Sequence, residues 1–432
     1  MNRNISSETA VLLEVAPLDA LVDEPLTIRL SGLQSGQTVK LWAHARDAEE
    51  HAWASSASFV ADRNGEVDLA TQQPVAGNYH RVDPMGLFWS MQPLDQKPPV
   101  PFMTVGLTSV EIELIAEIDG TAIAAARLRR RFASEDVVCT PVHEQGLVGA
   151  FAYPAHRGPL PAILILSGSD GQLRANQAAL LASRGFAALS LVYFGAEGLP
   201  KNLVDIPLEY FETAIHWLQA QSVVQKDRIG VIGLSRGGEL ALLLGATFPA
   251  IKAVVACSPS GLVHAGMDGR NFARSAWTYR GRSLQQVVVK FTLLLSFKLM
   301  WQSFRARSFP MRDMFLTTLK DHKHLAEATI SVERTQGPLL LISGNDDLMW
   351  PSTLFSEQVM QRLAEQQHPY PDQHLHYPGA GHFVSFPYGY PSLPPFVKRV
   401  NGLAVGGTIE DTAYSVADSW SKILAFFTQH LG

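Results

Sequence analysis

The stretch Arg228-Ile-Gly-Val-Ile-Gly-Leu-Ser-Arg-Gly-Gly-Glu-Leu-Ala-Leu-Leu-Leu-Gly245 decides the fold of this chain. Its first part, up to Leu234, is apolar with small breaks and predicts a short buried parallel strand. Its last part, from Gly238, predicts a helix. Ser235 then lies in a sharp strand-to-helix turn, where glycines on both sides avoid clashes. Because such a turn exposes the hydroxyl at the edge of the sheet, we expect Ser235 to be a nucleophile.

A carboxylate at the end of a later strand is the next group that this chemistry needs. Residues 338–344 form an apolar run that ends at Gly344-Asn-Asp-Asp-Leu-Met-Trp-Pro351, so both Asp346 and Asp347 are candidates. We choose Asp347, because its spacing from the preceding glycine and the following proline is typical of α/β-hydrolases. We expect Asp346 to be a turn residue, since Asp side chains commonly bond their own backbone in turns.

A histidine follows in the third position of the chain order serine, acid, histidine. His374-Leu-His-Tyr377 predicts a last strand, and the glycine-rich loop Pro378-Gly-Ala-Gly-His382 comes directly after it. We therefore expect His382 to be the general base. His374 and His376 share one side of the predicted strand, and we interpret both as structural residues.

These residue types predict nucleophilic acyl transfer through a Ser-His-Asp triad. Ser235 attacks a carbonyl, His382 accepts its proton and later gives it to the leaving group, and Asp347 fixes the imidazole tautomer. The oxyanion needs preorganised donors, of which one is the backbone N–H of Arg236. We assign the second to Ser169 or a neighbour, in the loop that follows the predicted strand 160–166. This chemistry requires no metal ion and no cofactor.

Composition limits the class of protein. The chain has 432 residues, which suggests two or three domains, and its net charge of −5 gives no reason to expect nucleic-acid binding. Cys139 and Cys257 are its two cysteines, and their spacing is not that of a metal site. Neither terminus matches a secretory, transit or lipidation signal, which favours a cytoplasmic protein. The sequence does not indicate an oligomeric state.

The pattern along the chain predicts two domains. Residues 10–135 contain short alternating segments separated by turn-formers and predict an immunoglobulin-like β-sandwich, with a hairpin about Asp119-Gly120. We interpret the apolar segment 85–91 as a core plug between strands, with a substrate-facing loop as the alternative. Residues 136–432 alternate strands with helices and predict a mostly parallel α/β sheet. Its expected elements are strands 160–166, 186–192, 228–234, 251–257, 338–344 and 374–377, and helices 175–184, 208–221, 238–245 and 417–430.

One insertion, at about 261–328, interrupts this alternation and is long enough for a lid. Between residues 261 and 325 it carries eleven Lys and Arg against three Asp, together with dense apolar residues. Lys290 and Lys298 exclude a membrane-spanning helix, but peripheral contact with a membrane stays open. A helical lid over an apolar tunnel, an interfacial helix and a packed structural helix are the three interpretations. A basic and apolar lid would suit a ligand with an anionic head and an apolar tail.

The chain resembles the acyl-CoA thioesterase and bile acid-CoA:amino acid N-acyltransferase family. The resemblance rests on Val22-Asp-Glu-Pro-Leu26, Ile28-Arg-Leu-Ser-Gly32 and Asp83-Pro-Met-Gly-Leu-Phe-Trp-Ser90, and, after residue 136, on the segments of Ser235, Asp347 and His382 quoted above. It implies a β-sandwich followed by an α/β-hydrolase domain and carries the family's nucleophile, acid and histidine onto those three residues. Members that conjugate bile acids have cysteine as the nucleophile, so serine here favours hydrolysis.

These expectations lead to one main hypothesis and three alternatives. The main hypothesis is hydrolysis of medium- to long-chain acyl-CoA to free fatty acid and CoA, with CoA phosphates meeting lid arginines. The alternatives are acyl transfer to an amino acid, a carboxylesterase or lactone hydrolase, and a catalytically silent ligand-binding protein.

Overall fold

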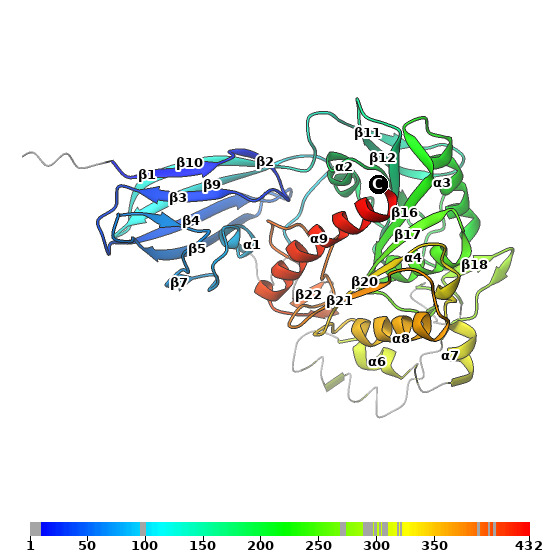
Figure 1. Cartoon of the computed structure of the whole chain (residues 1–432). Coiled ribbons are helices and arrows are strands. Elements are labelled where there is room, and N and C mark those ends of the chain that lie inside the picture. Colours follow the sequence, from blue (N-terminus) through cyan, green and yellow to red (C-terminus); the bar gives the residue numbers. More distant parts are fainter. Residues whose placement is uncertain are drawn as a thin grey trace, which may run out of the picture. The chain divides into compact units, whose positions relative to one another are not determined.

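The structure, a computed structural model, describes residues 10–95, 101–267, 274–287, 310–317, 322–386, 389–395, 398–400 and 403–432, and the single positions 297, 300, 301, 304 and 319. It forms two compact units, which are described separately (Figure 1). The units divide between Phe132 and Ala133, three residues before the predicted boundary at 135. Residues 391–394 belong to the first unit although they lie far along the chain, and the sequence pattern contained no sign of this return.

Two sheets form the first unit. One has the strand order β1-β3-β6, and the other has the order β2-β10-β9-β4-β5-β7, with β8 paired to β5. Most strands bury alternate residues, as in β4, because each sheet covers a common core with one face. The strands are β1 Leu12–Ala16, β2 Asp19–Leu21, β3 Thr27–Ser31, β4 Thr38–Arg46, β5 Ala52–Val60, β6 Val67–Asp68, β7 Ala76–Gly77, β8 Gln92–Pro93, β9 Val110–Ile118 and β10 Thr121–Arg131.

Two local predictions in this unit are confirmed. Strands β9 and β10 form an antiparallel hairpin, and its turn residues Asp119 and Gly120 have φ of 49° and 78°, which suits a two-residue hairpin turn. The segment 85–91 contains the short helix α1 (Gly86–Trp89), whose four residues are buried. This burial favours the core plug over the substrate-facing loop.

The second unit is built on an eight-stranded sheet. Its order is β11-β12-β14-β13-β16-β17-β20-β21, and every neighbouring pair from β14 onward is parallel. Strands β13, β14, β17 and β20 are almost entirely buried, as their continuous apolar runs require. The strands are β11 Val137–Val142, β12 Val148–Pro154, β13 Leu160–Leu166, β14 Ala187–Val192, β16 Val224–Leu234, β17 Ile251–Cys257, β20 Leu339–Gly344 and β21 Gln373–Tyr377.

Helices cover both faces of this sheet. A Cβ at Gly230 would touch Phe427 and Leu431 of α9, whereas a Cβ at Gly245 of α4 would touch Val254. Gly230 is the register partner of Ala253, so α4 and α9 lie on opposite faces. The helices are α2 Ala175–Ser183, α3 Leu208–Ala220, α4 Arg236–Thr247, α8 Ser352–Glu365 and α9 Ile409–Leu431. The second unit has the α/β-hydrolase fold.

The predicted lid is only partly described. Its described residues form β18 (Trp277–Tyr279), which pairs with β15 (Ile206–Pro207) and β19 (Arg282–Ser283), and the short helices α6 (Arg312–Leu316) and α7 (His322–Ala328). The described part of this insertion thus contributes two strands to a small sheet, as well as the expected helices. The 3-10 helix η2 is Val332–Arg334, and β22 (Lys398–Val400) pairs with β23 (Leu403–Gly406). In the described part of the chain, no helix combines the length and apolarity needed to cross a bilayer.

Candidate active site

Ser235 occupies a strained turn between β16 and α4. Its φ of 61° and ψ of −122° lie outside the regions that non-glycine residues usually adopt. The turn is sterically closed, because a Cβ at Gly233 would lie 2.1 Å from the Gly237 carbonyl oxygen, and a Cβ at Gly237 would lie 2.5 Å from that of Ser167. Both glycines of the Gly-x-Ser-x-Gly pattern are therefore required for this geometry.

The backbone on either side of Ser235 is anchored. Its N–H donates to the Cys257 carbonyl oxygen at 2.9 Å, and its own carbonyl accepts from the Glu239 N–H at 3.0 Å. Arg236 is the first residue of α4, where the N–H groups of a helix have no partner within the helix. The Ser235 side chain is half-buried. This is the local geometry of a nucleophile backed by a helix N-terminus.

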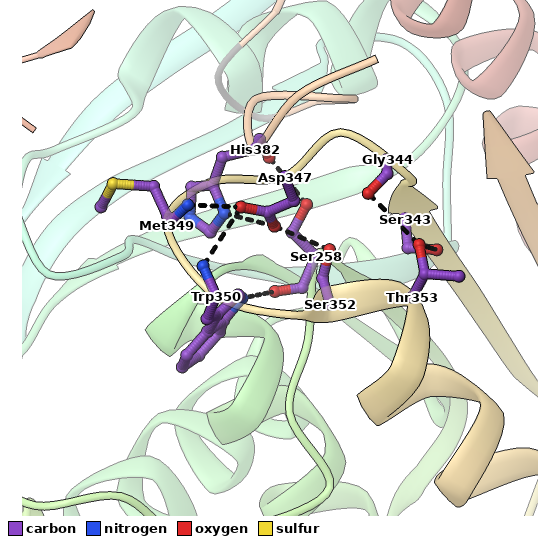
Figure 2. A network of polar contacts seen from close by, with 9 residues as sticks. All are labelled: Ser258, Ser343, Gly344, Asp347, Met349, Trp350, Ser352, Thr353 and His382. Carbon is purple, nitrogen blue, oxygen red and sulfur yellow. Dashed lines mark hydrogen bonds and ion pairs between the residues drawn. The ribbon is translucent and has the colours of Figure 1, made fainter. Parts of the chain in front are cut away.

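Asp347 is held by hydrogen bonds to both carboxylate oxygens (Figure 2). Oδ1 accepts the backbone N–H groups of Met349 and Trp350 at 2.9 and 3.2 Å. Oδ2 accepts from the Ser352 hydroxyl at 2.7 Å and lies 2.8 Å from Nδ1 of His382. The Asp347 side chain is 1% exposed, so its orientation is fixed by this network.

His382 is the other half of this buried pair. An ionised carboxylate can only accept hydrogen bonds, so Nδ1 of His382 carries the proton that it shares with Asp347. The remaining ring nitrogen, Nε2, is buried and has no hydrogen-bond partner among the residues that the structure describes. In the neutral ring this nitrogen carries a free lone pair, as a general base requires.

The backbone of His382 is also fixed. Its N–H donates to the Val405 carbonyl oxygen at 2.9 Å, and its own carbonyl accepts the Ser258 hydroxyl at 2.7 Å. Val405 also accepts the N–H of Leu348 at 3.4 Å, so β23 holds the acid loop and the histidine loop together. The sequence analysis did not predict β23. The sequence signal for its end was the pair Gly406-Gly407, which adopts φ of 77° and 81° in the structure.

Asp346 has a different part in this arrangement. Its carboxylate accepts the Gly407 N–H at 2.9 Å, and its own N–H donates to the Ala380 carbonyl oxygen at 3.0 Å. It ties the acid loop to neighbouring backbone, whereas the His382 ring bonds Asp347.

The loop that carries Ser169 lies against the nucleophile turn. The Leu166 and Ser167 carbonyls are the nearest atoms to a Cβ at Gly237, and the Tyr193 hydroxyl holds the Ser167 carbonyl at 2.5 Å. Ser169 itself is exposed. This loop therefore lies against Gly237, the residue after Arg236, and an oxyanion hole formed by the Arg236 N–H and a donor of this loop stays a prediction.

A buried charged group behind the nucleophile was not anticipated from the sequence. Nη1 of Arg236 lies 2.7 Å from the Glu239 carboxylate, which also accepts from Nε1 of Trp277 at 2.8 Å and from the backbone N–H of His264 at 3.2 Å. Burial raises the pKa of Glu239 to about 7, against the opposing effect of Arg236. The signal was one acid within the apolar helix α4. Glu239 therefore connects the start of the lid to the helix that follows Ser235.

His264 is not an alternative base. Burial, and then the charge of Arg236, lower its pKa well below the usual value, and its Nε2 is bonded to the Ser260 hydroxyl at 2.9 Å. His374 contacts Ser343 through Nε2 at 2.8 Å, and burial lowers its pKa to about 4. Neither ring contacts the Asp347 carboxylate, so His382 is the histidine that this acid orients.

Residues of the predicted lid pack on the acid loop. Trp350, which follows Asp347, has ring contacts with His382, His264 and Phe315 at 6.1, 5.2 and 5.6 Å between centroids. Leu262, Val287, Ala328 and Phe355 complete this apolar cluster. Among the basic lid residues, Arg274 forms an ion pair with Asp205, and Arg270, Arg305 and Arg307 lie outside the described residues. No group of three His, Cys, Asp or Glu side chains is arranged to hold a metal ion in the described ranges.

Comparison with known proteins identifies two family regions. Residues 206–432 match the C-terminal domain described as BAAT/acyl-CoA thioester hydrolase, and residues 23–144 match the N-terminal region of the same family. A Mus musculus peroxisomal succinyl-coenzyme A thioesterase is 30% identical over 421 residues, covering 95% of this chain and 94% of that protein.

Other relatives have related names. A Mus musculus acyl-coenzyme A thioesterase 6 is 31% identical over 95% of this chain and 94% of its own length. A Mus musculus acyl-coenzyme A amino acid N-acyltransferase 1 is 30% identical over 98% of both. Among solved structures, a puromycin-hydrolysing peptidase from Mycobacterium tuberculosis covers 98% of this chain and 68% of its own at 15% identity and a TM-score of 0.44. The similarity to the named relatives spans nearly the whole chain, which belongs to the acyl-CoA thioester hydrolase and bile acid-CoA:amino acid N-acyltransferase family.

Proposed function

We propose that the chain is an acyl-CoA thioesterase that works through an acyl-enzyme on Ser235, with His382 as general base and acid and Asp347 as the orienting carboxylate. The observation that carries the proposal is the buried His382–Asp347 pair, joined at 2.8 Å. It leaves Nε2 of His382 without a hydrogen-bond partner among the described residues. The strand end Cys257–Ser258 bonds both the Ser235 N–H and the His382 carbonyl. Membership of the acyl-CoA thioester hydrolase family supports a thioester as the substrate.

The reaction follows from these groups. The Ser235 oxygen attacks the thioester carbonyl carbon while its proton moves to Nε2 of His382. The resulting oxyanion is stabilised by the Arg236 N–H and by a donor of the 167–169 loop. The carbon–sulfur bond then breaks, and His382 returns the proton to the CoA thiolate. Water attacks the serine ester with His382 again as base, which releases the carboxylic acid and free Ser235.

Water as the final acceptor is supported by the nucleophile. The intermediate on serine is an oxygen ester, which reacts with amines less readily than the thioester that a cysteine would form. Acyl transfer to an amino acid is the second candidate function, because a relative of that name is 30% identical over 98% of this chain. A carboxylesterase or lactone hydrolase would use the same three residues on another substrate.

A medium- to long-chain acyl group is the substrate that we propose within this class. One support is the apolar cluster of predicted lid residues beside Trp350. The other is the eleven Lys and Arg side chains between positions 261 and 325, which suit a phosphate-bearing head group. A relative named for succinyl-coenzyme A sets the competing expectation of a short, acidic acyl group. A cytoplasmic location stays a prediction, since named relatives are peroxisomal and mitochondrial.

Release of free thiol from a panel of acyl-CoAs tests the proposal. Acetyl-, succinyl-, octanoyl- and palmitoyl-CoA are each incubated with the parent chain, with Ser235→Ala, and with Ser421→Ala as a control for an exposed serine far along α9. We expect release that is fastest for the longer acyl groups, that stops in Ser235→Ala and that persists in Ser421→Ala. Thiol release that leaves N-acyl glycine or taurine in mass spectra would favour the transferase, and faster turnover of a nitrophenyl ester would favour an esterase.

A further inference from the structure

The carboxyl end of β17 lies between the strands that carry the proposed nucleophile and the proposed acid. The sheet order is β16-β17-β20, and the register pairs Leu234 with Cys257 and Cys257 with Ile342. Ser258 is the first residue beyond β17, and it is fully buried. No motif of the sequence pointed to this position, because its contacts arise only from the strand order.

The Cys257–Ser258 dipeptide bonds two residues of the proposed triad directly and reaches the third, Asp347, through Trp350. The Cys257 carbonyl accepts the Ser235 N–H at 2.9 Å. The Ser258 hydroxyl donates to the His382 carbonyl oxygen at 2.7 Å, and the Ser258 carbonyl accepts Nε1 of Trp350 at 2.9 Å. The Trp350 N–H in turn donates to Asp347. Figure 2 shows Ser258 between Trp350 and His382.

Ser258 holds this position in a left-handed backbone conformation. Its φ is 40°, and its own N–H continues the β20 ladder by donating to the Ile342 carbonyl at 2.6 Å. This conformation disfavours any residue with a Cβ, and glycine would adopt it without strain. A serine that keeps a strained backbone while using its N–H, C=O and hydroxyl in three different directions suggests that the hydroxyl has a role of its own.

The hydroxyl supplies a contact that the other bonds of His382 do not. The ring bonds Asp347 and the backbone N–H bonds Val405, and both of these partners lie on the acid side of the site. The Ser258 hydroxyl bonds His382 directly to the end of β17, where the neighbouring Cys257 carbonyl accepts the Ser235 N–H. Loss of this bond would leave the histidine loop free to shift relative to the nucleophile.

We propose that Ser258 is a positioning residue for the acyl-transfer reaction, holding His382 in register with Ser235 through the hydrogen bond from its hydroxyl to the His382 carbonyl. The proposal rests on the proposed function for the identity of the triad. Ser258 touches neither substrate nor a reacting atom, so it acts only through His382. A shift of about 1 Å in a catalytic group is enough to lower a rate about 100-fold.

Two substitutions at Ser258 separate the hydroxyl from the backbone strain. Ser258→Ala removes the hydroxyl and keeps the Cβ, whereas Ser258→Gly removes both. The glycine variant can therefore still be measured if the alanine variant fails to fold. Ser415→Ala is the matched control, since this buried hydroxyl also donates to a carbonyl of the same loop, that of Val384, at 3.0 Å. For each variant we would measure the melting temperature, kcat and KM for acyl-CoA, and the rate at which a fluorophosphonate labels Ser235.

We expect Ser258→Ala and Ser258→Gly to lower kcat and the labelling rate about 10- to 100-fold with KM within about twofold, and Ser415→Ala to stay within about threefold of the parent. In a His382→Ala background, where there is no imidazole to position, Ser258→Ala should change the labelling rate less than about twofold. A folded Ser258→Ala protein with parental kcat would overturn the proposal. So would labelling rates in which the effects of Ser258→Ala and His382→Ala multiply in the double variant.

Fluorophosphonate labelling of Ser235 distinguishes a failure of this proposal from a failure of the proposed function. A parent chain that is labelled at Ser235 but releases no thiol contradicts thioesterase activity, and the labelling rates of the Ser258 variants still decide the positioning role. A parent chain that is not labelled at Ser235 overturns both.

Discussion

Replacing Asp347 with asparagine tests the assignment of the acid most sharply. The Met349 and Trp350 N–H groups donate to Oδ1, so the oxygen of the new amide should stay there and its NH₂ group should face His382. That group can only donate, so Nδ1 of His382 must become the acceptor and the ring proton must move to Nε2. The ring then has no lone pair to offer Ser235. We expect kcat to fall about 10⁴-fold, equivalent to about 5.4 kcal/mol of barrier.

The neighbouring acid provides the matched control. Asparagine at Asp346 keeps an oxygen that can accept the Gly407 N–H, so Asp346→Asn should leave kcat within about threefold of the parent. The assay is free-thiol release from the preferred acyl-CoA, with melting temperatures to show that both variants fold. The reasoning is refuted if Asp347→Asn keeps more than about a tenth of the parental kcat, or if Asp346→Asn causes the larger loss.

Three further predictions concern other parts of the site. Burial raises the pKa of Glu239 to about 7 from its usual value of 4.5, so between these pH values the folded state holds a proton that the unfolded state has lost. The parent should therefore become less stable relative to Glu239→Gln as pH rises from about 4.5 to about 7, by up to about 1.4 kcal/mol per pH unit. Denaturant unfolding of both proteins at about pH 4.5 and about pH 7, the two ends of this range, measures the change in relative stability. A relative gain for the parent at the higher pH would contradict the prediction. Gly233→Ala would put a Cβ 2.1 Å from the Gly237 carbonyl oxygen and should cost more than about 3 kcal/mol; a melting temperature equal to that of the parent would show that the turn is not closed in this way. Ser169→Ala should leave kcat within about threefold, because only a backbone N–H of that loop is proposed to act; a loss of more than about 100-fold would assign the donor to the Ser169 hydroxyl instead.

Local patterns predicted most of the second unit. Strands β13 and β17 begin and end where the apolar runs do, because fully buried parallel strands need uninterrupted apolar residues. One miss has a local reason. The start of α9 was placed at residue 417, whereas Thr408 caps the helix by accepting the Asp411 N–H at 3.0 Å.

The supporting contacts of the site could not be predicted in the same way. The three proposed triad residues could be predicted because each follows a strand, in the chain order serine, acid, histidine: Ser235, Asp347 and His382. Ser258 and His382 are 124 residues apart in the chain. Val405 of β23 accepts hydrogen bonds from both the acid loop and the histidine loop. Such contacts depend on which strands become neighbours, and no local pattern of residues encodes that. The same holds for Glu239, whose partner Trp277 comes from the lid.

Trapping the acyl-enzyme tests the central claim most directly. The parent chain and Ser235→Ala would be mixed with palmitoyl-CoA, quenched in acid during turnover and digested for mass spectrometry. The account predicts a palmitoyl ester on the peptide that contains Ser235 in the parent and none in Ser235→Ala, and His382→Ala should form it far more slowly. Turnover without any adduct, or an acyl group carried on another residue such as Cys257, would contradict it.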